Sequence, residues 1–156
     1  MPGTAAVAIA VPTRHNGHVP GWTCPQCRRL FRRVGQSHEC SPAMSLDDYF
    51  STGPEHERPI AEAVISHLQT LGHLHVEPVS VGIFLKRTQT FAQLRPKDRW
   101  VALSFSLARR VHHDLITRKV IPYHGRFHHV ANLRTADDLD ERLRSWLTEA
   151  YLSSPE

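Results

Sequence analysis

Residues 99–107 read Arg-Trp-Val-Ala-Leu-Ser-Phe-Ser-Leu, and this stretch decides the fold class. Large apolar side chains alternate in it with small ones, so that one side carries Val101, Leu103, Phe105 and Leu107 and the other carries Ala102, Ser104 and Ser106. A period of two is typical of a β-strand with one buried face. Strands of this kind belong to antiparallel sheets. Residues 99–107 therefore predict an antiparallel sheet.

Further strands are expected on both sides of this one, at residues 74–79, 81–87, 119–123 and 127–133. Gly82 is expected to mark a β-bulge, because a glycine inside a strand often does. A short helical turn is expected at residues 46–50.

Two longer helices complete the pattern. Pro54 is expected in the first turn of one helix, whose apolar face is formed by Ile60, Val64, Leu68 and Leu71. Gly72 is expected to end it. Thr135 is expected to cap the second helix, with a stripe formed by Leu139, Leu143, Trp146, Leu147 and Ala150. The order predicts an α+β domain with an antiparallel sheet of four to five strands and two helices on one face.

The domain organisation follows from composition along the 156 residues. We expect a disordered leader at residues 1–19, a small cysteine-containing module at 20–41 and the α+β domain at 46–152. No stretch approaches the roughly 18 consecutive apolar residues of a membrane-spanning helix. The apolar run at 5–11 lacks a preceding basic segment, so no signal peptide and a cytoplasmic location are expected.

All three cysteines lie between residues 24 and 40, which predicts a metal site rather than a disulfide framework. Cys24 and Cys27 are separated by two residues, as in a metal-binding knuckle, and His38 and Cys40 supply two further ligands. Four sulfur and nitrogen ligands close a tetrahedral zinc site with no open position. The sequence therefore predicts one structural zinc ion.

This segment resembles the first half of a classical zinc finger, with Trp22 before the first cysteine and Phe31 after the second. The stretch from Phe31 to His38 is too short for a base-reading helix. A treble-clef, a ribbon or a CCHC-type knuckle-like hairpin is expected instead.

Basic residues gather in two places. The module carries four arginines close together, and residues 84–134 carry eleven lysines and arginines against two acids, Asp98 and Asp114. Basic side chains interleaved with Trp22 and Phe31 suit a nucleic-acid backbone and unstacked bases. The alternative is that the aromatics pack a small core and the arginines only solubilise it. The residues predicted to contact nucleic acid are Arg28, Arg29, Arg32, Arg33, Lys86, Arg87, Arg95, Lys97 and Arg99.

The main domain resembles a bacterial domain family of unknown function. The resemblance rests on Ile83-Phe-Leu-Lys-Arg87, Thr90-Phe-Ala92, Leu94-Arg-Pro-Lys97, Trp100-Val-Ala-Leu-Ser-Phe105 and the segment from Thr135 to Tyr151. Members occur alone, behind small zinc modules, or at the C-terminus of chains called predicted transport or nuclease-related proteins. The resemblance implies a loop at residues 90–97 and assigns no catalytic residue.

Three functions remain open at this point. The first is a non-enzymatic zinc-containing protein that binds nucleic acid or a nucleoprotein. The second is an adaptor that docks a protein partner through the zinc module. The third is a small-ligand or hydrolytic domain with a pocket formed by His128, Arg126 and Asp114, although no catalytic motif is present.

Overall fold

The computed structural model describes residues 21–154, so the leader expected at residues 1–19 lies outside the described residues. Two short strands, β1 (Trp22–Thr23) and β2 (Leu30–Phe31), form a hairpin of their own. The main sheet contains β3 (His75–Val79), β4 (Gly82–Lys86), β5 (Thr90–Pro96), β6 (Val101–Leu107), β7 (Ile121–Tyr123) and β8 (Arg126–Leu133). Their order across the sheet is β3-β4-β5-β6-β8-β7, and every pair is antiparallel.

The sheet has six strands, one more than the largest number expected, because residues 90–96 form β5 instead of a loop. Ala92 and Leu94 pair with Phe105 and Leu103 of β6. The strand escaped prediction because Phe91 and Ala92 are adjacent apolar residues, which interrupts the alternation, and because Pro96 reads as a loop residue. Pro96 stands at the last position of the strand, where a proline is tolerated.

The β-bulge expected at Gly82 lies elsewhere. The register of the β4–β5 pair shifts between Leu85 and Lys86. Gly82 is needed for another reason: a Cβ there would lie 2.3 Å from the carbonyl oxygen of Leu94, on the neighbouring strand. The glycine thus permits close approach of the β4 and β5 backbones.

Three α-helices accompany the sheet. The short α1 (Leu46–Ser51) forms where a turn is expected, and α2 (Glu57–Gln69) starts three residues after Pro54, so that proline lies before the helix. Thr135 caps a 3₁₀ turn (Ala136–Asp138) instead of the final helix, and α3 (Glu141–Leu152) begins after Asp140, whose side chain accepts a hydrogen bond from the Leu143 N–H. Thr135 and Asp140 are both residue types that cap helices, so the sequence alone does not show which of them precedes α3.

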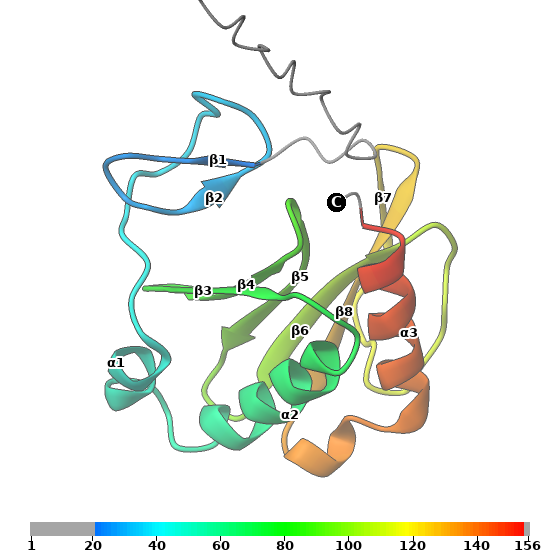
Figure 1. The fold of residues 1–156 in the computed structure, drawn as a ribbon. Helices are drawn as coiled ribbons and strands as arrows, with labels where there is room; N and C mark the ends of the chain where they lie inside the picture. The colour runs from blue at the N-terminus through cyan, green and yellow to red at the C-terminus, as the bar shows by residue number, and fades with distance from the viewer. Residues whose placement is uncertain (1–20, 155–156) are drawn as a thin grey trace, which may run out of the picture.

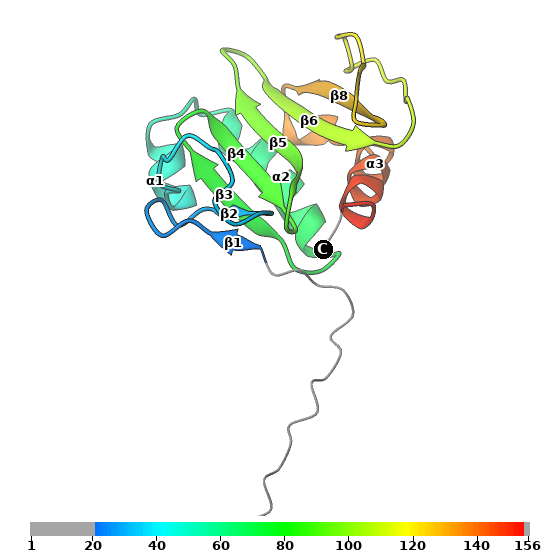
Figure 2. The same ribbon diagram turned by 90° about the horizontal axis from the view of Figure 1, so that it is seen from above.

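The expected helix stripes are buried, except for the partly buried Leu71, which follows α2. They pack with Ile83, Leu85, Leu94, Leu103 and Phe105 on one face of the sheet. Trp146 of α3 lies over Phe105, with ring centroids 6.3 Å apart. Figures 1 and 2 show α2 and α3 on this face and the β1–β2 hairpin over the opposite face, next to β3 and β4. We call that opposite face, formed by residues such as Glu77, Phe84, Lys86 and Ser106, the outer face.

No helix within residues 21–154 is long and apolar enough to cross a membrane.

Candidate metal centre and basic cleft

The β1–β2 hairpin brings the first two cysteines together. Its strands pair Trp22 with Phe31, and the Cys24 N–H donates to the Arg29 carbonyl at 3.0 Å. Arg28 adopts a left-handed backbone (φ 60°), which lets the chain turn sharply between Cys27 and β2. The Cys-Pro-Gln-Cys segment is therefore the loop of a tight hairpin, as the spacing predicts.

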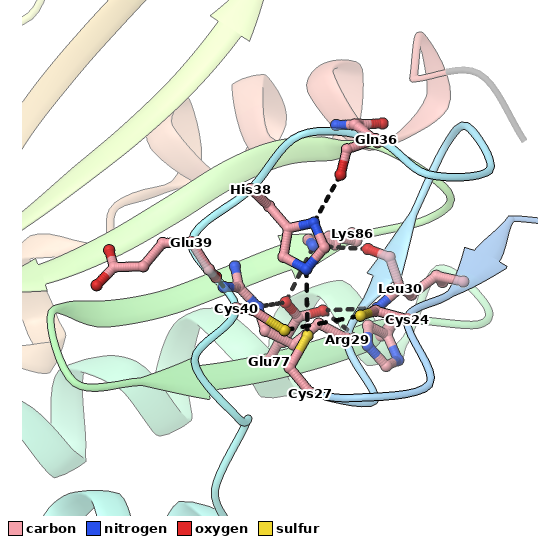
Figure 3. A network of polar contacts seen from close by, with 11 residues as sticks. Cys24, Cys27, Arg29, Leu30, Gln36, His38, Glu39, Cys40, Glu77 and Lys86 are labelled. Carbon is pink, nitrogen blue, oxygen red and sulfur yellow. Dashed lines mark hydrogen bonds and ion pairs between the residues drawn. The ribbon is translucent and has the colours of Figure 1, made fainter.

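Four potential ligand atoms converge beside this hairpin. The sulfur atoms of Cys24, Cys27 and Cys40 and a ring nitrogen of His38 all lie within 4.8 Å of one another. The Cys24 and Cys40 sulfurs are 3.8 Å apart, and the Cys27 sulfur lies 3.4 Å from His38 Nε2. Tetrahedral zinc with bonds of about 2.3 Å to sulfur places two sulfur ligands about 3.8 Å apart. The four residues thus lie close together in an arrangement compatible with zinc (Figure 3).

The polar groups around the four residues also suit a cation. His38 Nδ1 lies 2.6 Å from the Gln36 carbonyl oxygen, so Nδ1–H donates there and the Nε2 lone pair faces the cysteines. Hydrogen bonding from the Cys27 backbone N–H lowers the pKa of Cys24 to about 6. Desolvation and the neighbouring sulfur atoms raise the pKa of Cys40 to about 11. Three thiols this close do not all ionise unless a positive charge lies among them.

The aromatic residues of the module pack its small core. Phe31 is 7% exposed, its ring centroid lies 4.0 Å from that of His38, and Trp22 lies 6.0 Å from both. Phe31 also lies beneath the Lys86 ammonium of β4, at 4.8 Å. Phe31 is therefore a packing residue of the module and leaves no open face for a base.

A buried carboxylate attaches the module to the outer face. Glu77 of β3 is fully buried and pairs with the Arg29 guanidinium, with Lys86 Nζ at 3.1 Å and with His75 Nε2 at 3.1 Å. Glu77 Oε2 accepts from the Leu30 N–H at 3.4 Å, and Lys86 Nζ donates to the Leu30 carbonyl at 2.8 Å. Both backbone groups of Leu30 are thus bound by side chains of the sheet (Figure 3).

Burial alone would raise the pKa of Glu77. Hydrogen bonds from His75 and Arg29 and the charge of Lys86 outweigh that effect and lower the pKa to about 2. Glu77 is therefore ionised at neutral pH. Arg29 and Lys86, two of the residues expected to contact nucleic acid, are 8% and 4% exposed and serve this attachment instead.

Beside the attached module, the outer face is hollowed into a cleft. Two adjoining cavities of about 990 and 930 Å³ share the side chains of Arg32, Arg33, Gln89, Thr90, Tyr123 and His124. One wall comes from the module, another from the β7–β8 hairpin, and the floor includes the β4–β5 turn. Among the described residues, no aspartate or glutamate lines either cavity. The charged side chains that line the cleft are therefore cationic, and most of them are arginines.

The other residues expected to contact nucleic acid lie apart from the cleft. Arg28 is exposed in the turn between Cys27 and β2, and Arg87 contacts the Tyr151 ring at 4.6 Å and the Ser154 carbonyl. Exposed Arg95, Lys97 and Arg99 lie toward the far end of the β5–β6 hairpin.

The pocket expected from His128, Arg126 and Asp114 is only partly assembled. His128 and Arg126 line the cleft, whereas Asp114 lines a separate cavity with His112 and His113. Arg126 is held in place by the Ser106 hydroxyl at 3.0 Å and the Ser153 hydroxyl at 2.8 Å.

Sequence reasoning missed Glu77, Tyr123 and His124. Glu77 had a usable signal, because it is the only acid between residues 63 and 97 and lies inside an expected strand. Tyr123 and His124 had a weaker one: the His-Gly pair at 124–125 follows an expected strand, as a hairpin turn does.

Comparison with known proteins gives one match. Residues 46–154 match the family described as "Domain of unknown function (DUF5655)". No curated protein is detectably similar to the chain, and no solved structure is. The match covers the sheet and its helices and leaves the cysteine module outside it.

Proposed function

We propose, for a chain that belongs to the family described as a domain of unknown function (DUF5655), a role as a zinc-containing protein that binds nucleic acid without acting on it. The proposal has two parts. Cys24, Cys27, His38 and Cys40 hold one structural zinc ion, and the cleft beside the module receives the nucleic acid.

Charge around the module supports zinc. A zinc ion with three thiolates and one neutral histidine carries a net charge of about −1. Arg29, Lys86 and Glu77 together carry the opposite charge. Burial lowers the pKa of Lys86, and the Glu77 carboxylate opposes that effect. The buried cations of the attachment therefore compensate the excess negative charge of the metal site. When bound, the zinc supplies structural cross-linking of the hairpin and no chemistry on a substrate.

The observation that carries the nucleic-acid proposal is the lining of the cleft. Arg32 and Arg33 project into it from the module, and neither forms an ion pair within residues 21–154. Unpaired arginines beside hydrogen-bonding side chains suit a phosphate backbone, because each phosphate contact releases a condensed counterion. Because no carboxylate among the described residues lines the cleft, it lacks the oxygen ligands that Mg²⁺ prefers. The cleft therefore suits binding of nucleic acid better than its hydrolysis.

The proposal predicts salt-sensitive binding that depends on the cleft arginines. We expect a fluorescein-labelled mixed-sequence RNA or DNA to bind the zinc-loaded protein at low salt, measured by fluorescence anisotropy. The double variant Arg32→Ala/Arg33→Ala should bind about tenfold or more weakly. Its slope of log K against log salt should be shallower by about 1.4, since each lost phosphate contact on a single strand removes about 0.7.

The matched control is Lys97→Ala/Arg99→Ala, which removes the same charge from exposed positions outside the cleft. We expect this variant to change affinity by less than about threefold. Equal losses in both double variants would contradict the cleft as the binding surface. Absence of binding at low salt would contradict the function itself.

A further inference from the structure

The tip of the β7–β8 hairpin presents an aromatic ring to the cleft. Tyr123 and Arg126 are paired across a two-residue turn, in which His124 (φ 47°) and Gly125 (φ 74°) both have a left-handed backbone. Two consecutive residues of this kind form the tight turn that matches the twist of a hairpin. The tip is therefore a two-residue hairpin turn that places Tyr123 directly before it.

The ring of Tyr123 is unusually open for a large aromatic side chain. The residue is 69% exposed, and the ring of its neighbour His124 meets the phenol ring edge to face, with centroids 4.1 Å apart. Ile121, two residues earlier on the same strand, is 58% exposed. Isolated exposed apolar residues are common on protein surfaces. Here both lie on one face of a three-residue strand and both line the same cavity.

Besides Ile121, Phe91 and Ala150, polar groups line this cavity. Gln89 and Thr90 lie at the β4–β5 turn, and the Ser106 and Ser153 hydroxyls lie beside Arg126. Arg32 and Arg33 of the module lie along the same cavity as Tyr123. One cavity thus combines an exposed aromatic ring, hydrogen-bonding groups and unpaired cations. At about 930 Å³ it has the size of an organic-ligand site.

We propose that the cleft is a single-strand site, in which one unstacked base lies on Tyr123 and the adjoining phosphates lie on Arg32 and Arg33. The inference rests on the proposed function and specifies its substrate class. A duplex keeps its bases stacked inside and would leave the Tyr123 ring without a partner, whereas a single strand offers a base freely.

The test compares one labelled strand with its duplex. An oligothymidine of about 12 nucleotides, fluorescein-labelled, should bind the zinc-loaded protein at least about tenfold more tightly than the same strand annealed to oligoadenine. Tyr123→Ala should weaken binding of the single strand by about five- to a hundredfold and leave duplex binding nearly unchanged. Tyr123→Phe keeps the ring and should bind within about twofold of the wild type.

Separate outcomes identify which proposal fails. Equal affinity for strand and duplex, with no effect of Tyr123→Ala but a loss in Arg32→Ala/Arg33→Ala, would overturn the single-strand site and leave nucleic-acid binding intact. No binding of either probe at low salt would overturn both. Because Tyr123 is exposed, Tyr123→Ala should unfold at the wild-type temperature, so a binding loss reports the contact and not the fold.

Discussion

Glu77 shows how one residue can determine where a module lies. Its carboxylate accepts hydrogen bonds from Arg29 and the Leu30 N–H in the module and pairs with Lys86 on the neighbouring strand. Arg29, Glu77 and Lys86 are all buried, so bulk water has little access to these charged groups. Removing one member leaves the other charges buried and uncompensated, which is the costly case for an internal ion pair.

The pKa of Glu77 gives this residue a defined pH dependence. The folded value of about 2 lies below the ordinary value of 4.5, so the carboxylate adds stability above pH 4.5 and loses it as the pH falls toward 2. We expect Glu77→Gln to destabilise the protein by about 3 kcal/mol at neutral pH. The difference in unfolding free energy between the variant and the wild type should shrink steadily as the pH falls below 4.5. Urea unfolding at a series of pH values measures it.

Glu57→Gln is the matched control, since Glu57 is equally buried but lies in the helix-covered core beside Tyr49. Burial raises the pKa of Glu57, so its contribution to stability falls as the pH rises above 4.5. Glu57→Gln should therefore destabilise the protein less at neutral pH than Glu77→Gln does. The opposite ranking would contradict the assigned role of Glu77.

Single residues were predictable where their partners are close in the sequence. The Cys-x-x-Cys and His-x-Cys spacings place four residues that the structure brings together. Arg29 and Lys86 were expected to contact nucleic acid because the sequence shows their charge but does not show that both pair with Glu77. Arg29 and Glu77 are 48 residues apart, and a pairing over that distance is set by the fold.

At the scale of elements, the module and the sheet have different sources of stability. Within residues 21–41, the buried apolar core of the module consists of Cys24, Cys27 and Phe31, with Trp22 packed against it. The main domain buries its own large apolar cluster between the sheet and α2 and α3. We therefore expect a module of about 20 residues with so small a core to need bound metal to fold, and the main domain to fold without it.

Zinc removal should therefore affect the two parts unequally. Metal analysis should find one zinc per chain, and a chelator should remove it. Amide exchange should then accelerate by about tenfold or more in residues 21–40, while β5, β6, β8 and α3 keep their protection. Cys40→Ser, which changes an exposed residue, should give the same pattern without a chelator.

Ser37→Ala is a control for Cys40→Ser, because Ser37 is exposed in the same loop and supplies no ligand atom to the cluster. It should retain full zinc and wild-type exchange. A Cys40→Ser protein with full zinc content and unchanged exchange would contradict the assigned metal site.

Elements were predicted well where one pattern dominates and poorly where two compete. The strand at residues 101–107 and the stripe of α3 carry clear periodicity and are present. The β5 segment combines two adjacent apolar residues with a terminal proline, and its pairing to β4 and β6 decides its conformation. The 3₁₀ turn at Thr135 is separate from α3 because each has its own local cap, the capping box of Thr135 and Asp138 and the side chain of Asp140.

At the scale of the whole molecule, the two faces of the sheet are covered by different parts of the chain. Helices α2 and α3 cover one face and complete the core, whereas the module covers part of the other (Figures 1 and 2). The cleft lies beside the module. The sequence shows that the module and residues 84–134 are both basic. It does not show that basic residues of both segments line one cleft, because that depends on the attachment of Leu30 and Arg29 to the outer face.

Photo-crosslinking measures directly whether the cleft holds nucleic acid. An oligothymidine containing 4-thiothymidine would be irradiated with the zinc-loaded protein, and the crosslinked peptides would be mapped by mass spectrometry. We predict that crosslinks fall on Tyr123 and His124 and on the module loop around Arg32 and Arg33. Crosslinks confined to the turn at residues 97–99 or to α2 and α3, with none in the cleft, would contradict the account.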